Sequence, residues 1–199
     1  MRQIKIFIWV LADIFALGIL VVSRAPAQKL PPKKERRRLR GGTASALGAL
    51  KSFAGITLDG EMFTQKDIAA KDITIINFWT LTCGSCLVEL PDLAAFAGAL
   101  PDNVRMMTVC VDGGGDPEIT AEVLQKAGFE GVTIIAGGGD LATLCGNLMY
   151  TPTTVVVDSE GNLMGDAIIG AQTDLSGTYL AAVNAALKET GKTEIRLAE

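Results

Sequence analysis

The chain has 199 residues, of which 49% are hydrophobic and none is histidine. This length gives one globular domain room for a proper core. The absence of histidine removes the usual general base of serine and cysteine hydrolases and the commonest metal ligand. Residues 1–40 hold ten Lys and Arg against two acidic residues, whereas residues 41–199 hold eight against twenty. An acidic domain argues against nucleic-acid binding, which requires a basic surface.

The N-terminus carries an apolar run, residues 6–22, interrupted only by Asp13. This run is close to the minimum length that spans a hydrocarbon core, so we expect residues 1–23 to be a membrane anchor. Small residues at 25–27 leave open a signal peptide that is cleaved near Ala27 and releases the domain.

Residues 24–50 have the composition of a basic linker that contains proline and glycine, and residues 51–199 are expected to form the domain. Seven Lys and Arg between positions 29 and 40 follow the apolar run. Taken literally, the positive-inside rule would keep the domain in the cytoplasm. The alternative is a basic tether beside anionic headgroups on the outer side.

The domain alternates between strand-like and helix-like segments, which predicts an α/β fold with a mixed sheet. In chain order we expect a hairpin at 53–63 turned at Asp59-Gly60, a helical turn at 65–70, a buried strand at 73–79, a helix at 86–100 with a kink at Pro91, a buried strand at 104–111, a helix at 117–127, a short strand at 133–136, a helix at 140–148, two hairpin strands at 153–158 and 163–169, and a closing helix at 175–188. The glycine runs 113–115 and 137–139 are expected to be turns, since neither continues as a phosphate loop.

The central motif is the pair Cys83 and Cys86, placed where the buried strand at 73–79 gives way to a helix. The first N–H groups and the dipole of a helix favour a thiolate, so Cys83 should have a lowered pKa and act as the nucleophile. Cys86 lies one turn on and can act as the resolving thiol. No metal or organic cofactor is needed for such exchange.

A lone pair of cysteines at this spacing can also be half of a zinc site. No second pair or histidine completes four ligands, because Cys110 and Cys145 are isolated within predicted elements. We therefore favour a redox dithiol. Cys110 and Cys145 are interpreted as buried small hydrophobes, with a second redox pair as the alternative.

Four pieces of sequence between residues 53 and 188 together resemble one family. They are Asn77-Phe78-Trp79 before the dithiol, Glu89-Leu90-Pro91 after it, Tyr150-Thr151-Pro152-Thr153-Thr154, and Val157 to Leu163. The domain is similar to the TlpA/ResA type of thioredoxin-fold protein, the membrane-anchored extracytoplasmic disulfide reductases. The resemblance implies a thioredoxin fold with a mixed central sheet flanked by helices, here with an N-terminal hairpin extension.

The resemblance also implies roles for single residues. Pro152 should be cis and face the dithiol, and Thr151 should offer backbone hydrogen bonds to an extended substrate. Glu89 falls where the family has an acidic residue near the active site, and it could tune a thiol pKa or relay the proton of Cys86. A surface glutamate without function is the alternative. Asn77 stands where cytoplasmic thioredoxins have a buried aspartate.

The chain departs from the family pattern at two positions. Thr82 replaces the usual tryptophan before the first cysteine, and Ser85 replaces the usual proline between the cysteines. Thr82 and Trp79 are named with Thr151 and Pro152 as candidate substrate contacts. For Trp79, a place in the core and in the wall of the active site is favoured over a role as a binding platform. Ser85 in place of proline can move the reduction potential in either direction.

The leading hypothesis is a disulfide reductase of exported proteins, and the family implies apocytochromes as one substrate and an upstream membrane thiol as electron donor. Two alternatives stay open. A peroxiredoxin-like peroxidase is suggested by Thr80, three residues before Cys83, but a nearby arginine is lacking. A membrane-tethered redox sensor or binding module would use the same dithiol without turnover.

Overall fold

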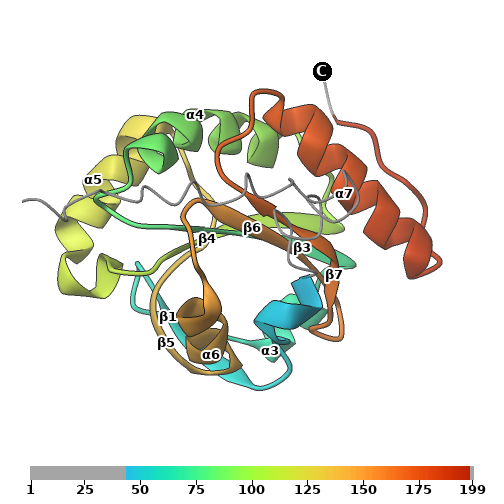
Figure 1. Ribbon diagram of the computed structural model, residues 1–199, viewed down its shortest axis with the longest axis horizontal. Coiled ribbons are helices and arrows are strands. Elements are labelled where there is room, and N and C mark those ends of the chain that lie inside the picture. Colours follow the sequence, from blue (N-terminus) through green and yellow to red (C-terminus); the bar gives the residue numbers. More distant parts are fainter. Residues whose placement is uncertain (1–43, 198–199) are drawn as a thin grey trace, which may run out of the picture. The chain divides into compact units, whose positions relative to one another are not determined.

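The computed structural model describes residues 44–197, which form a mixed seven-stranded sheet with helices on both faces (Figure 1). The strand order across the sheet is β2-β1-β5-β4-β3-β6-β7. The strands are β1 (Phe53–Thr57), β2 (Met62–Thr64), β3 (Ile73–Trp79), β4 (Val104–Cys110), β5 (Thr133–Gly139), β6 (Thr153–Asp158) and β7 (Leu163–Ile169). Strands β3, β4 and β5 run parallel, while β6 is antiparallel to β3 and β7 to β6.

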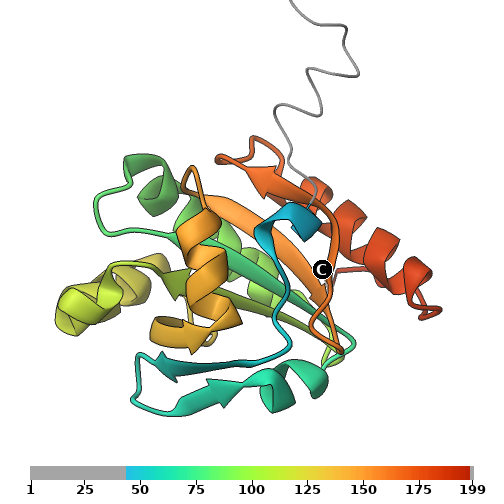
Figure 2. The same ribbon diagram turned by 60° about the horizontal axis from the view of Figure 1, so that its bottom comes forward.

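Each face of this sheet is covered by its own set of helices. In Figure 1, α4, α5 and α7 lie above the sheet, and α3 and α6 lie below it. Figure 2 turns the second face forward, with α6 and the short η1 lying on it. The helical segments are η1 (Ala44–Leu47), α3 (Gln65–Ala69), α4 (Gly84–Gly98), η2 (Gly113–Gly115), α5 (Pro117–Ala127), α6 (Asp140–Asn147) and α7 (Leu175–Glu189).

Strand β3 is buried along its whole length because it contributes to both cores. Successive side chains of a strand point to opposite faces. Ile75 and Trp79 pack into the core under α4, α5 and α7, whereas Ile76 and Phe78 pack into the core under α6 and α3. Covered on both faces, β3 is the strand from which the dithiol loop departs.

The predicted elements are present, but α4 begins and ends two residues before the helix predicted at 86–100, and the glycine run 113–115, predicted as a turn, is the short helix η2. The largest difference is at the glycine run 137–139. This run was expected to be a turn, but it is the second half of β5 and pairs with β1. A Cβ on Gly137 would lie 2.6 Å from Leu141 Cδ2, and one on Gly139 would lie 2.4 Å from the carbonyl oxygen of Ser52. The glycines therefore allow α6 and the chain before β1 to pack closely against β5, a role that turn composition does not reveal.

Residues 44–50, whose composition predicted a linker, pack against the domain. Ala44 and Leu50 are fully buried in the core beneath α6, and the Leu50 N–H donates to the Gly161 carbonyl at 2.8 Å. The ordered domain thus includes these seven residues.

The expected membrane anchor at residues 1–23, and the cleavage position near Ala27, lie outside the described residues. Among residues 44–197, no helix has the length and apolar character needed to cross a membrane.

Candidate functional site

Cys83 and Cys86 are joined by a disulfide at the start of α4, with their Cα atoms 5.2 Å apart. Cys83 is the N-cap residue of this helix, and its Sγ accepts the backbone N–H of Cys86 at 3.2 Å. Cys83 is partly exposed, whereas Cys86 is buried at 1% exposure. An N-terminal helix position with an N–H donor on sulfur stabilises a thiolate at Cys83. The more exposed sulfur of Cys83 and the buried sulfur of Cys86 are arranged as an attacking and a resolving cysteine would be, and these two roles stay predictions.

Four segments meet around this disulfide because of the strand directions. Three of the segments follow the last residues of β3, β4 and β7, and the fourth precedes the first residue of β6. These four strand ends lie at one edge of the sheet. We call this region the dithiol edge; it comprises residues 80–88, 111–118, 148–152 and 169–176.

Hydrogen bonds connect the segments of the dithiol edge directly. Leu81 N–H donates to Asp112 Oδ1 at 2.9 Å, and Gly170 N–H donates to the Pro152 carbonyl at 2.8 Å. The Thr151–Pro152 peptide bond is cis, as the resemblance implied. The Thr151 carbonyl oxygen lies 3.5 Å from Cys83 Sγ. The Thr151 carbonyl thus lies beside Cys83, and contact of Thr151 and Pro152 with a substrate stays a prediction.

Glu89 lies one turn after Cys86 and is buried, with 3% of its surface exposed. Its Oε1 accepts the backbone N–H of Gln172 at 3.1 Å, and its Oε2 has no hydrogen-bond partner among the described residues. Burial raises the pKa of Glu89, and the charge of Asp92 adds to this, although the Gln172 hydrogen bond opposes it. Glu89 is therefore a buried acid with a free oxygen, which differs from a surface glutamate.

A buried hydrogen-bond chain lies next to Glu89. Asn77 Nδ2 donates to Thr154 Oγ1 at 2.9 Å, and Thr154 Oγ1 shares a 2.7 Å hydrogen bond with the Tyr179 hydroxyl. Burial raises the pKa of Tyr179, and the charge of Glu89 raises it further. Thr154, Tyr179 and Gln172 were not predicted as site residues. Only the fold brings β6, α7 and the 169–176 segment beside α4.

The two further candidate substrate contacts have different outcomes. Thr82 is exposed in the segment before the nucleophile, so it is available to a partner. Trp79 is 0% exposed and belongs to the core beneath α4. The prediction that Trp79 contacts substrate is corrected: as a residue of a strand covered on both faces, it supports the dithiol loop from below.

Cys110 and Cys145 line one cavity of about 210 Å³ between β4, β5 and α6. Both are free thiols. Burial, together with the neighbouring Asp112, raises the pKa of Cys110 to about 12, and burial also raises the pKa of Cys145. Protonated thiols of this kind are poor nucleophiles. Within residues 44–197, no cluster of three or more Cys, Asp or Glu side chains is arranged to hold a metal ion.

The domain is similar in structure to proteins of known structure. No protein-family model matches the chain, and no curated protein does. The thioredoxin domain of a thiol-disulfide oxidoreductase from Bacteroides vulgatus superposes with a TM-score of 0.56 at 21% identity, covering 69% of this chain and 97% of that one.

Two secreted proteins are similar in the same way. A secreted disulfide oxidoreductase from Mycobacterium tuberculosis, described as homologous to Escherichia coli DsbE, has a TM-score of 0.53 at 21% identity over 65% of this chain and 96% of its own. A secreted thiol-disulfide isomerase from Corynebacterium glutamicum has a TM-score of 0.59 at 20% identity over 70% and 85%. These similarities establish the α/β thioredoxin-like fold.

Proposed function

We propose that the chain is a thiol:disulfide oxidoreductase that reduces disulfides in other polypeptides through Cys83 and Cys86. One observation carries this proposal: the two cysteines are already paired at a helix N-terminus, with Cys83 partly exposed beside the carbonyl before a cis-proline. The structurally similar proteins whose names describe them as disulfide oxidoreductase or isomerase support it.

The exchange proceeds in two balanced steps. The Cys83 thiolate attacks one sulfur of the target disulfide, whose S–S bond breaks, and the departing thiolate takes up a proton. The Cys86 thiol then loses its proton and attacks Cys83 Sγ, which forms the Cys83–Cys86 disulfide and releases the second target thiol. Two electrons pass to the target. Return to the dithiol requires a separate thiol donor, which we place upstream in the membrane.

Glu89 is the proposed acceptor of the Cys86 proton. It lies one turn from Cys86 on α4, its Oε2 is free of protein partners in the described domain, and burial raises its pKa. A carboxylate with a raised pKa is a stronger base than an exposed one, so it suits deprotonation of a shielded thiol.

The proposed location is outside the cytoplasm, with the N-terminal residues as an anchor or cleaved near Ala27. Two of the structurally similar proteins are described as secreted. The proposed partners are exported proteins that contain disulfides, apocytochromes among them. Labelling of intact cells with a membrane-impermeant thiol reagent tests the location, since a cytoplasmic domain would stay unlabelled.

The peroxidase alternative receives no support from the described residues. The arginines of that region are Arg105 and Arg196. Arg105 is the second residue of β4, at the opposite edge from Cys83, and donates to the Asp67 carbonyl oxygen, while Arg196 lies in the segment after α7. A peroxide-reducing thiolate needs an arginine beside it.

The direct test is a redox titration of the full chain in glutathione buffers. A double variant, Cys110→Ser with Cys145→Ser, leaves the dithiol as the sole titrating pair and serves as the matched control. A reversible two-electron couple more reducing than glutathione supports a reductase. An oxidising potential recasts the protein as a disulfide donor. Failure to form the Cys83–Cys86 disulfide in solution would overturn the proposal.

A further inference from the structure

The dithiol edge carries most of the large apolar side chains that the described domain leaves exposed. Nine such side chains are exposed in all, and six of them belong to this edge. They are Leu87, Val88, Val111, Met149, Tyr150 and Ile169. Val88, two residues after Cys86, and Met149, two residues before Thr151, are 79% and 81% exposed. The Thr151 carbonyl oxygen lies 3.5 Å from Cys83 Sγ. Exposed apolar side chains gathered on one side of a domain favour an interaction site there.

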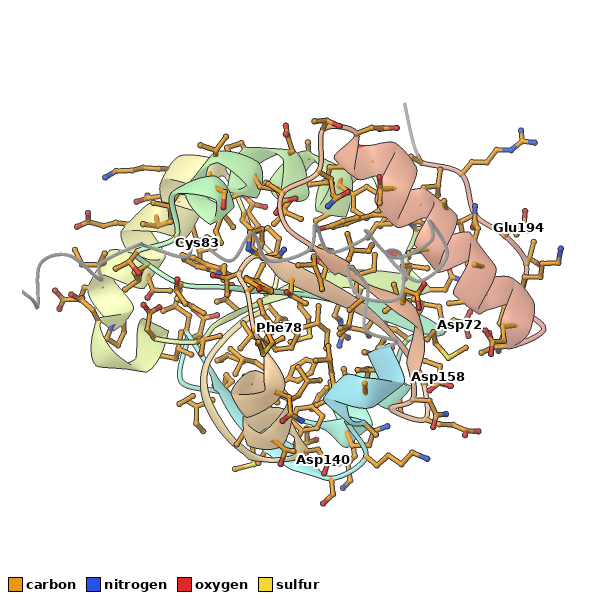
Figure 3. The ribbon with its side chains drawn as sticks, in the orientation of Figure 1. Asp72, Phe78, Cys83, Asp140, Asp158 and Glu194 are labelled. Atoms are coloured by element: carbon orange, nitrogen blue, oxygen red, sulfur yellow. A yellow bond between two sulfur atoms is a disulfide. The ribbon has the colours of Figure 1, made fainter. Side chains whose placement is uncertain are left out.

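The same edge carries charge of one sign. Its four segments contain four charged residues, all exposed and all acidic: Asp112, Asp116, Glu118 and Asp174. No Lys or Arg lies in any of the four segments. Three of the described cations lie at the opposite end of the sheet: Lys71 precedes β3, Lys126 lies in the last turn of α5, and Lys192 pairs with Asp72 at 3.0 Å. Figure 3 shows Asp72 and Cys83 at opposite ends of the sheet, so the charges of the opposite edge are of both signs whereas those of the dithiol edge are all negative.

The negative charge of the dithiol edge discriminates among the partners that could bind its apolar side chains. A second copy would bring an equally acidic edge against this one, and an anionic lipid surface or the anionic disulfide of glutathione would be repelled in the same way. A cationic polypeptide is attracted. Resting on the proposed function, we propose that the preferred substrate is a polypeptide disulfide whose neighbouring residues are apolar and flanked by Lys or Arg.

The test compares two synthetic peptides with the reduced full chain. Each peptide contains the same intramolecular disulfide and the same adjacent leucine, and the flanking residues are two lysines on each side in one and two glutamates in the other. At low ionic strength we expect the basic peptide to be reduced about tenfold faster, a modest steering effect. In about 1 M salt, where the screening length is about 3 Å, the two rates should converge.

Variants locate the effect on the dithiol edge. Asp116→Asn, Glu118→Gln and Asp174→Asn together remove three charges and keep the side-chain caps of α5 and α7, since asparagine caps as well as aspartate. This triple variant should lose most of the preference. The matched control, Asp59→Asn with Glu130→Gln and Glu189→Gln, removes three exposed charges from the opposite edge and should keep it.

The apolar part is tested with Val88→Thr and Met149→Gln together, which should slow both peptides several-fold. Met62→Gln is its control, because Met62 is 66% exposed on β2, the outermost strand beyond β1. Equal reduction rates for the two peptides at low salt would overturn this inference. So would a loss of the preference for the basic peptide in the opposite-edge control alone. Neither result would contradict the proposed oxidoreductase function. Reduction of neither peptide would overturn the proposed function, and the substrate preference with it.

Discussion

Two buried threonines of identical exposure allow the hydrogen-bond chain beside Glu89 to be tested quantitatively. Thr154 on β6 and Thr74 on β3 are each 1% exposed. Thr154 Oγ1 bonds both Asn77 and Tyr179, whereas Thr74 Oγ1 has no partner among the described residues. Replacement of threonine by valine removes the hydroxyl and keeps the shape, so the two variants differ chiefly in what the hydroxyl was doing.

The expected magnitudes follow from these partners. Thr154→Val removes the shared partner of a buried amide N–H and a buried phenol, at about 1–3 kcal/mol each. Because the Asn77 amide also lies within reach of the Tyr179 hydroxyl, the two can partly compensate, and we expect the free energy of unfolding to fall by about 2–4 kcal/mol, less than the full sum of about 6 kcal/mol. Thr74→Val removes a buried hydroxyl that already lacks a partner, and we expect a change between zero and about 1 kcal/mol of stabilisation.

The assay is equilibrium denaturation in urea, with the denaturant slope checked for each variant because an altered slope would indicate a change in the unfolded state. Equal destabilisation by the two substitutions would refute the reasoning, since it would show that the hydrogen bonds of Thr154 contribute nothing beyond packing. A double variant with Tyr179→Phe provides a cycle, in which the second change should cost less once Thr154 Oγ1 is gone.

Three further predictions follow. Glu89→Gln should slow release of the mixed disulfide by about 10–100-fold in single-turnover kinetics. The folded pKa of Glu89 is raised above its ordinary value of 4.5, so the stability of the wild type should fall relative to this variant as pH rises from 4.5 through the raised value. A stability difference that does not change with pH would contradict this. With its pKa near 12, Cys110 should resist alkylation at pH 8 in the folded, reduced protein, as followed by mass spectrometry, and rapid labelling would show that its site opens. Gly161→Ala places a Cβ 2.3 Å from the Leu50 carbonyl oxygen and should destabilise the domain more than Gly60→Ala, which has a similar positive φ and open space; equal losses in thermal unfolding would mean that the contact yields.

The dithiol and its neighbours illustrate how far residue patterns reach. An apolar strand followed by two cysteines three residues apart predicted that the dithiol lies at a helix N-terminus, although the helix begins at Gly84 and not at Cys86 as its apolar spacing suggested. Thr151 and Pro152 were placed beside Cys83 by resemblance, and the structure has them there. Trp79 was misassigned, because a residue next to an active-site loop can still point into a core.

The glycine run at 137–139 was misread for a related reason. Local composition predicts a turn wherever glycines gather, whereas here β1 and α6 approach β5 so closely that side chains would collide. Close approach is a property of distant segments and has no local signal.

The order of strands and helices, the dithiol and the acidic character of the domain could be determined from the sequence by itself, since each depends on residues close together in the chain or on composition. Only the tertiary structure decided that Glu89 is buried beside Tyr179, that its carboxylate meets Gln172 N–H, and that Val88, Met149 and Asp174 share one edge with Cys83. The physical reason is that burial and surface charge arise from packing of residues distant in sequence, through the strand directions of the sheet.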